Sequence, residues 1–270
     1  MSKTTIPDTA FQKSPGIAAL FRIELIKLRR SHIFWILLIP AAMMWIPSAL
    51  NADVNFHMDD IGISPEYNFF IQGFMGMAWF MIPAALAVCT VLLNQTERTH
   101  KGFLKMLSLP INTGRFCLAK FLVLLLLMTV QMLFTIAFYY AGAFLASRLA
   151  DYNFVLGLPY AAGCTVKIYL AAIPMASVFW MLAVLIKTPI FSAGICLASL
   201  VPSVLVMNTK LWPFYPMDYP FYMLMTEYGK QAEGIFSAEI QWMPMLPAAG
   251  AVTGGCLLIA CVCFGKGDTN

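Results

Sequence analysis

Six long apolar runs constrain this chain more than any other feature. A helix needs about 20 apolar residues to cross the hydrocarbon core of a bilayer. The runs cover residues 33–50, 69–93, 116–145, 166–186, 190–207 and 243–264. The third would form a helix about 45 Å long, so it must tilt or extend beyond the hydrocarbon core. The pattern predicts an all-α polytopic membrane protein with six transmembrane helices.

The composition and the motifs exclude several classes of function. Only 11% of the 270 residues are charged, against about 25% in an average soluble domain. No acidic residue lies in the middle of a run, which argues against an ion-driven transporter or a selective ion channel, because these usually carry an ionisable group there. The chain has no GxxxxGK[ST], HExxH or GxSxG motif. We therefore expect no enzyme activity in this chain, and any ATP hydrolysis that drives it would occur on a separate ATPase.

The cysteines and histidines give no sign of a metal or redox site. None of the seven cysteines forms a CxxC pair, and most lie inside apolar runs, where a free cysteine behaves as a small hydrophobe. The three histidines, His32, His57 and His100, are far apart in the sequence. We expect no metal site and no cofactor bound by this chain.

Lys and Arg residues are divided unevenly between the segments that join the runs. With the N-terminus in the cytoplasm, 13 of the 17 fall in cytoplasmic segments. The four outer ones are Arg148, Lys167, Lys210 and Lys230. Because cytoplasmic loops carry an excess of Lys and Arg, we expect both termini on the cytoplasmic side of a bacterial inner (cytoplasmic) membrane. The basic residues thus suit a lipid bilayer as partner, and we expect no nucleic acid.

The N-terminal segment divides into a tail and a helix. Residues 1–16 are polar and contain Pro7 and Pro15, which predicts a disordered tail before a single membrane domain over residues 17–270. A cleaved signal peptide is the alternative interpretation of the first run, since Ser48 and Ala49 are small residues near its end. About 30 residues precede that run, which favours a retained span.

Residues 17–30 have the pattern of an amphipathic helix. Its apolar side contains Ile17, Leu20, Phe21, Leu25 and Leu28, and its basic side Arg22, Lys27, Arg29 and Arg30. Such a helix is expected to lie on the cytoplasmic face of the membrane, where its basic residues meet anionic headgroups. The alternative is a simple topology signal before the first span.

Asn94–Arg115 is the longest charged stretch expected between two spans. Its apolar side contains Phe103, Leu104, Met106, Leu107 and Leu109, and its basic side Arg98, Lys101 and Lys105. Thr96 would cap a short helix that ends before Pro110. An amphipathic helix there must rest on the bilayer, on the bundle, or in a groove of a partner protein. The periodicity alone leaves this interpretation and a solvated loop equally open.

Two outer segments are candidates for meeting a ligand. Leu211–Met225 is aromatic, rich in Met and nearly uncharged, and we predict that Pro213, Pro216 and Pro220 prevent a regular helix there. It is interpreted either as an aromatic belt that anchors two spans or as an outer gate that meets an amphipathic ligand. The candidate outer substrate surface combines an acidic loop with these aromatics, namely Asp53, Asp59, Asp60, Trp212, Tyr215, Tyr219 and Tyr222.

These segments together resemble a known family. The basic segment ending in ELIKLRRS leads directly into the first run, and an acidic outer loop follows. The second run ends in NQTER and continues through KGFLK to LPI, Arg115 and AKF. In this arrangement the chain resembles the permease subunits of ABC-2 type exporters, in particular those of lantibiotic immunity and bacitracin resistance. The resemblance covers nearly the whole chain and is sharpest over Glu97–Lys120, whereas Leu211–Met225 departs from it.

The resemblance implies an ABC-2 (type V exporter-like) fold and a division of roles. Residues 17–30 would be an elbow helix and Thr96–Leu109 a coupling helix that seats in a groove of the ATPase. The implied ATPase contacts are Glu97, Arg98, His100, Lys101, Phe103 and Lys105. Two permeases, identical or paired with a sister subunit, would stand on two ATPase subunits, which use ATP and Mg.

The resemblance also implies a function, and one alternative stays open. The chain would be the permease of an ATP-driven exporter that expels an antimicrobial peptide or another amphipathic, lipid-like substrate, giving self-immunity or resistance. The alternative is a membrane-embedded peptide-binding or sensory immunity protein without a transport cycle. An intramembrane enzyme is disfavoured because no pair of catalytic residues lies within the runs.

Overall fold

A computed structural model describes residues 16–28, 33–98, 112–232 and 239–264, and these residues form helices and loops without a strand. In chain order the elements are α1 (Ile17–Leu28), α2 (Ile33–Leu50), the 3-10 helix η1 (Ala52–Ile61), α3 (Pro65–Gly76), the π-helical turn η2 (Met77–Met81), α4 (Ile82–Arg98), α6 (Thr113–Leu149), α7 (Leu158–Leu185), α8 (Pro189–Ala198), α9 (Ser203–Val206), the 3-10 turn η4 (Trp212–Phe214), α10 (Tyr219–Gln231) and α11 (Trp242–Cys263).

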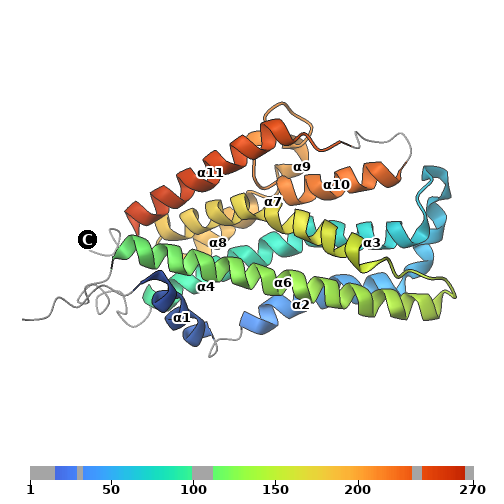
Figure 1. The fold of residues 1–270 in the computed structure, drawn as a ribbon, viewed down its shortest axis with the longest axis horizontal. Helices are drawn as coiled ribbons and strands as arrows, with labels where there is room; N and C mark the ends of the chain where they lie inside the picture. The colour runs from blue at the N-terminus through green and yellow to red at the C-terminus, as the bar shows by residue number, and fades with distance from the viewer. Residues whose placement is uncertain (1–15, 29–32, 99–111, 233–238, 265–270) are drawn as a thin grey trace, which may run out of the picture.

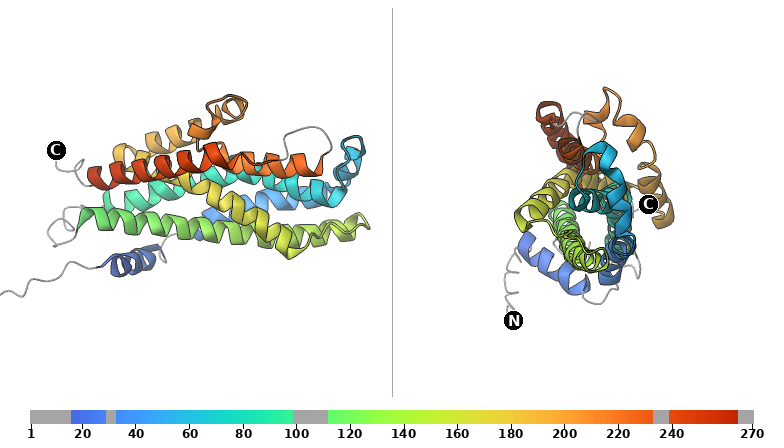
Figure 2. Two further views of the ribbon diagram at one scale, coloured as in Figure 1. Left: turned by 45° about the horizontal axis from the view of Figure 1, so that its top comes forward. Right: turned by 90° about the vertical axis from the view of Figure 1, so that its right-hand side faces the viewer.

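The long helices run side by side along one axis, which gives the bundle two distinct ends (Figures 1 and 2). α1 and the last turn of α11 lie at one end, here called the α1 end. The loop between α2 and α3, which contains η1, lies at the other, here called the η1 end. α6 extends over nearly the whole length and packs against α1, α2, α4, α7 and α11.

The six predicted spans are confirmed by length and composition. The helices long and apolar enough to cross a membrane are Ile33–Leu50, Pro65–Gln95, Thr113–Leu149, Leu158–Leu185, Pro189–Val206 and Trp242–Cys263. The fourth begins well before the predicted residue 166, because Pro159 suits the first turn of a helix. The fifth is interrupted at residues 199–202, where the chain turns between α8 and α9.

The first span belongs to the core of the bundle. Trp45 of α2 is fully buried, and its ring lies 5.1 Å from Tyr139 of α6 and 5.8 Å from Phe69 of α3, centroid to centroid. The indole fits because Gly73 faces it: a Cβ added there would lie 2.3 Å from a ring carbon. This close packing supports a retained span and not a cleaved signal peptide.

The second span contains a π-helical turn, which explains how Pro83 fits inside it. A proline clashes with the carbonyl of the residue four positions earlier, and here that residue, Trp79, lies within η2. In the wider π-helical turn the regular backbone hydrogen bond between residues four positions apart is absent, so Pro83 breaks no such bond there. The span therefore continues from α3 through η2 into α4, with Met77 and Ala78 buried in the turn.

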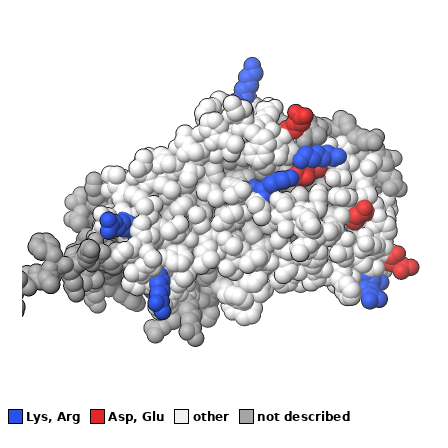
Figure 3. All heavy atoms as spheres, in the orientation of Figure 1, with Lys and Arg blue, Asp and Glu red and all other residues white. Residues whose placement is uncertain are grey.

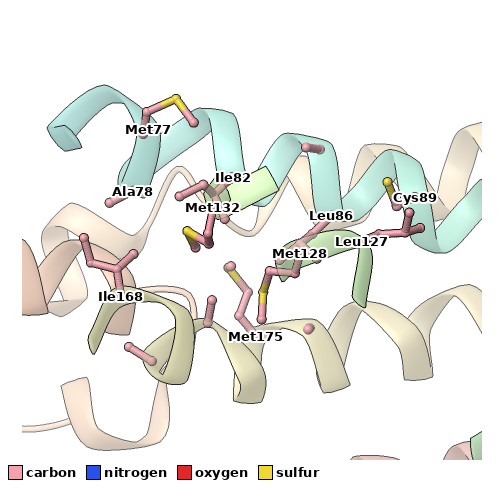
Figure 4. Close-up of a cluster of buried hydrophobic side chains, with 14 of the residues drawn as sticks. Met77, Ala78, Ile82, Leu86, Cys89, Leu127, Met128, Met132, Ile168 and Met175 are labelled. Atoms are coloured by element: carbon pink, nitrogen blue, oxygen red, sulfur yellow. The ribbon is translucent and has the colours of Figure 1, made fainter. Parts of the chain in front are cut away.

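Sulfur-containing and aliphatic side chains fill the middle of the bundle (Figure 4). Met77 and Cys89 of the second span, Met128 and Met132 of α6 and Met175 of α7 belong to this cluster, and all five are buried. Unbranched Met side chains fill irregular gaps and adapt when neighbouring helices shift. Among the described residues no Asp or Glu lies in this region, as the sequence predicts.

The prediction that three prolines prevent a helix in Leu211–Met225 is wrong. α10 begins at Tyr219, and Pro220 occupies its first turn, where a backbone N–H has no helical partner to lose. Pro213 likewise stands in the first turn of η4. α10 packs against α7 and α3 on the η1 side of the bundle (Figure 1).

Candidate functional sites at the two ends of the bundle

At the α1 end, the predicted amphipathic helix forms as α1 and rests on the bundle. Leu20 is buried, and Phe21, Leu25 and Leu28 pack against the core, with α6 as the main neighbour. Ile17, predicted on the same side, is exposed, and so are Arg22 and Lys27. The apolar side of α1 is thus covered in part by the bundle, and its exposed part can contact lipid. Arg29 and Arg30 lie outside the described residues.

A buried ion pair joins α1 to two other helices. The Nζ of Lys120, on α6, donates to Glu24 Oε2 of α1 at 2.7 Å and to the backbone oxygen of Leu93 on α4 at 2.9 Å. The Lys120 side chain is 0% exposed and that of Glu24 2%. These three residues, here called the Lys120 junction, connect elements that are far apart in the sequence.

Further contacts extend the Lys120 junction. Lys27 donates to the other oxygen of Glu24 at 2.6 Å. The Lys120 ammonium lies 5.0 Å from the centroid of the Phe116 ring, and that ring lies 5.8 Å from Phe264, just after α11. Cation–π and ring contacts favour this arrangement once water is excluded. The junction thus reaches α11 at the same end.

The Lys120 junction lies close in sequence to the predicted coupling helix, Thr96–Leu109, here called the coupling segment. Leu93 and Asn94 of α4 are buried, and the Asn94 amide donates to the backbone oxygen of Ala183 on α7. After Asn94, α4 continues to Arg98. On the other side of the segment, the Asn112 side chain accepts from the backbone N–H groups of Gly114 and Arg115 and so caps α6.

Most predicted coupling residues cannot be placed relative to this junction. Glu97 and Arg98 belong to the last turn of α4, but their side chains are outside the described set. His100, Lys101, Phe103 and Lys105 lie outside the described residues altogether, as does the predicted coupling helix that contains them.

Sequence patterns missed Glu24, although a signal was present. Leu20, Glu24 and Leu28 are spaced four residues apart, so they share one face of a helix. A carboxylate on the buried face of a helix needs a charged or hydrogen-bonding partner. Lys120, inside an apolar run, is a basic residue that needs one as well. The sequence gives no reason to pair these two groups.

At the η1 end, the predicted outer substrate surface separates into two parts. Asp53 is exposed on η1, and Asp59 and Asp60 belong to the same element although their side chains are outside the described set. The aromatic residues lie on and around η4 and α10 instead, and no close packing of η1 against α10 is seen in the described residues. Trp212 and Tyr222 line one cavity, and neutral residues next to Asp53 in sequence line another.

The aromatic part contains a stacked pair beside a cavity. The rings of Trp212 and Tyr222 lie 4.4 Å apart at 28° and line a cavity of about 170 Å³ with Met207, Asn208, Met225, Thr226 and Gln241. Tyr219, predicted on this surface, is fully buried and donates to the backbone oxygen of Pro213. Tyr215 is half-buried and donates to the backbone oxygen of Ser199. The prediction of an accessible Tyr219 is therefore wrong, since its hydroxyl closes the turn before α10.

The acidic part borders a larger cavity, of about 380 Å³, lined by carboxamide and hydroxyl side chains and a few apolar ones: Pro47, Ser48, Asn51, Val54, Asn55, Asn68, Phe69 and Gln72. Sequence reasoning missed these amides because single Asn and Gln residues at the end of a span carry no motif. Only the turn at η1 brings Asn55 next to Asn68, 13 residues away.

Two acidic residues near α10 were also not predicted. Asp218 precedes α10, is 1% exposed, and neither carboxylate oxygen has a hydrogen-bond partner in the described structure. Burial raises the pKa of this carboxyl to about 8. Glu227 differs: burial alone would raise its pKa, but hydrogen bonds from Lys167 and Lys230, at 2.6 and 2.9 Å, hold it below the usual range.

On the face shown in Figure 3 most of the surface is uncharged, and the charged side chains that it carries are few and scattered. This distribution fits a hydrocarbon belt around the bundle. Among the described residues, no three His, Cys, Asp or Glu side chains are grouped as metal ligands.

Comparison with known proteins gives one match. A family model described as ABC-2 family transporter protein matches residues 20–203, which is more than half of the chain and includes α2 through α8, Glu24 and Lys120. No curated protein matches the chain.

Proposed function

Because the chain belongs to the ABC-2 transporter family, we propose that it is the permease subunit of an ATP-driven exporter that expels an antimicrobial peptide, such as a lantibiotic, or another amphipathic substrate. Membership implies association with an ABC ATPase and with the membrane. Expulsion of such a peptide would give self-immunity or resistance. The ATPase would bind ATP and Mg, and this chain would bind no cofactor and hydrolyse nothing.

The Lys120 junction carries the proposal. A permease without an ATPase of its own must transmit force from a partner through its surface segments. Here one buried ammonium holds α1 and α6 to the turn of α4 that leads into Glu97 and Arg98. Movement imposed on the coupling segment therefore acts on three helices together. This is the arrangement expected of a transmission point.

The distribution of basic residues supports the orientation in which the α1 end faces the cytoplasm. The last turns of α4, the start of α6, α1 and the C-terminal end of α11 lie at that end (Figure 1), and most Lys and Arg residues of the chain belong to sequence segments that precede, join or follow these elements. We place both termini on the cytoplasmic side of a bacterial cell membrane. Two copies of the ATPase and a second permease, identical or a sister subunit, would complete the exporter.

The middle of the bundle supports an amphipathic substrate. Its Met-rich core carries no Asp or Glu in the described spans, so it offers nothing that a coupling ion needs. Near the η1 end, the Trp212–Tyr222 pair and neighbouring Met residues line a cavity of mixed polarity. Aromatic and Met side chains accommodate apolar groups of varied shape.

Co-purification with charge reversal tests the proposal. We expect an ATPase to purify with the tagged protein, and the Arg98→Glu/Lys101→Glu double variant to lose peptide-stimulated ATP hydrolysis while still inserting into the membrane. Lys210→Glu, which reverses an exposed charge in the turn between α9 and η4, is the matched control and should retain activity. If no ATPase co-purifies but the peptide still binds, the protein is a binding or sensory protein without a transport cycle.

A further inference from the structure

The larger cavity at the η1 end has the chemistry of a binding site. It lies between the last turn of α2, η1 and the first half of α3, and its volume of about 380 Å³ is within the range of small-ligand sites. Four carboxamide side chains, of Asn51, Asn55, Asn68 and Gln72, contribute to its lining. Among the described residues no charged side chain lines it.

A chain of hydrogen bonds holds three of these amides in place. Gln72 donates to Asn68 at 3.5 Å, Asn68 donates to Asn55 at 2.9 Å, and Asn55 donates to the backbone oxygen of Ala52 at 2.9 Å. Asn68 is 1% exposed and Asn55 7%, whereas Gln72 is exposed. The inner amides are thus fixed by the fold, and the chain ends at an accessible group.

The amides retain hydrogen-bonding capacity that the fold does not use. A carboxamide has two N–H donors and one oxygen acceptor. The bonds above use one N–H of each of the three amides, and Asn51 uses one N–H on the backbone oxygen of Pro47. The exposed amides, Asn51 and Gln72, therefore each retain one N–H donor and the oxygen acceptor for a ligand. Matched N–H and C=O groups are what an extended peptide backbone offers in return.

The surroundings favour a cationic amphipathic peptide as the ligand. Val54, which lines the cavity, is 54% exposed, and Leu50, which precedes Asn51 in sequence, is 62% exposed, so apolar surface is available to a ligand beside the amides. Asp53 is exposed on the same turn, and the loop of residues 51–68 contains four acidic residues and no Lys or Arg. A neutral sugar would gain nothing from that charge, whereas a cationic peptide would be attracted by it.

We infer that this carboxamide cavity binds the backbone of a short extended stretch of a cationic amphipathic peptide, through Asn51 and Gln72. The inference rests on the proposed function for the identity of the peptide as substrate, but not for binding itself. The amides recognise groups that every peptide shares, so the cavity selects by backbone, charge and amphipathicity and not by side-chain sequence.

A double-mutant cycle between protein and peptide tests the inference. The full chain in glycan-free lipid nanodiscs is titrated with a labelled Leu- and Lys-rich peptide and with the same peptide N-methylated at two adjacent backbone amides. We expect the Asn51→Leu/Gln72→Leu variant to bind the parent peptide about tenfold more weakly, the order of magnitude of two lost neutral hydrogen bonds. N-methylation should weaken binding to the wild type but not weaken binding to the variant further.

The cycle removes the effect of N-methylation on the conformation of the free peptide, because that effect is the same for both proteins. Asn153→Ala, at an exposed amide of the same end that lines neither cavity, is the matched control and should bind like the wild type. Equal losses on N-methylation in wild type and variant would overturn the inference. Displacement of the peptide by a hexose-bearing lipid, lost in the variant, would make the cavity a sugar site and also overturn it.

The outcome is independent of transport. If the cycle shows the expected coupling but no ATPase co-purifies, the inference holds and the proposed function fails. If the ATPase co-purifies and the parent peptide stimulates wild type and the Asn51→Leu/Gln72→Leu variant equally at every concentration, the proposed function holds and the cavity is not the site.

Discussion

The α1 end of the bundle is joined by an ion pair in which both partners are buried, whereas the η1 end is joined mainly by hydrogen bonds and aromatic rings, and the lysines that pair with Glu227 on the η1 side are more than a third exposed. At the α1 end, Lys120 and Glu24 are both buried and hold three elements. At the η1 end, Tyr139 accepts from the Leu156 backbone N–H at 2.9 Å and its ring packs on Trp45 and Phe70. The difference in chemistry indicates a difference in purpose.

Ring packing stabilises without needing a partner of opposite charge. A buried ion pair is different, because the cost of removing two charges from water roughly cancels their attraction, and apolar replacements of similar size are often as stable. Instead, the ion pair fixes the register of the helices, because each buried charge is satisfied only when it meets its partner. We therefore interpret the Lys120 junction as a device that fixes how α1, α4 and α6 move relative to one another, and the η1 end as the rigid frame around the outer cavities.

The largest expected effect comes from breaking the ion pair on one side. Lys120→Met removes the buried lysine that pairs with Glu24 and leaves the exposed Lys27 in contact with this carboxylate. Because a buried charge then loses its buried partner, the protein should be destabilised by about 3–5 kcal/mol. Lys27→Met is the matched control, since its side chain is 40% exposed, and should cost about 1 kcal/mol or less. Thermal unfolding in nanodiscs measures both. If both variants lose the same amount of stability, the burial of Lys120 does not make its ion pair different from that of Lys27.

A second prediction concerns the buried acid beside α10. The pKa of Asp218 is raised by burial to about 8, so the folded state holds its proton while the unfolded state releases it near its usual value of 3.8. Stability should therefore fall as the pH rises from about 4 to 8, by several kcal/mol in total. Asp218→Asn should remove this part of the pH dependence and be more stable than wild type at pH 8. If the stability of the wild type and of Asp218→Asn falls equally with rising pH, the pH dependence does not come from Asp218.

Gly73→Ala tests the rigid packing of the η1 half. The added methyl would lie 2.3 Å from the Trp45 ring, and because that ring is held on several sides, we expect a loss of about 1–3 kcal/mol. Gly163→Ala in α7 is the matched control, since nothing lies within 4 Å of its Cβ position, and should be neutral or slightly stabilising. Trp45 fluorescence during unfolding reports the change. If Gly73→Ala does not change the stability, the η1 half of the bundle accommodates an added methyl group more easily than its packing indicates.

The smallest expected effect is at Tyr152, in the loop between α6 and α7. Its hydroxyl donates to Glu66 at 2.5 Å, and this bond raises the pKa of Tyr152 to about 12. Tyr152→Phe removes the bond and should cost about 1–2 kcal/mol at neutral pH, as expected for a hydrogen bond to a charged group. Burial also raises the pKa of Tyr219 to about 12, so spectroscopic titration should show late-ionising tyrosines in both proteins, with one fewer in the variant. An equal number of late-ionising tyrosines in the two proteins would contradict the assignment.

The spans were predictable because hydrophobic length is a local property. The runs at 33–50 and 243–264 match α2 and α11 within a residue. The errors fall where local rules compete: Pro220 prevents a helix in most positions but starts α10 well, and Lys167 interrupts an apolar run although it pairs with Glu227 of another helix. Position within the element and partners distant in sequence decided both cases.

The candidate sites were predictable only in part. The amphipathic helix α1 and the aromatic character of the segment with Trp212 and Tyr222 follow from composition and spacing, whereas the stacking of these two rings does not. The pairing of Glu24 with Lys120, 96 residues away, and the meeting of Asn55 with Asn68 do not. Both depend on how helices pack and on the turn at η1, which a single sequence without these contacts does not encode in any short pattern.

The Glu24→Met/Lys120→Met double variant, examined for both stability and peptide-stimulated ATP hydrolysis with its ATPase bound, tests the central claim most directly. If the Lys120 junction sets register, the double variant should unfold within about 1 kcal/mol of the wild type, well above Lys120→Met alone, yet lose most of the stimulated hydrolysis. A double variant that is stable and fully stimulated would contradict the claim, because α1, α4 and α6 would then be coupled without the ion pair.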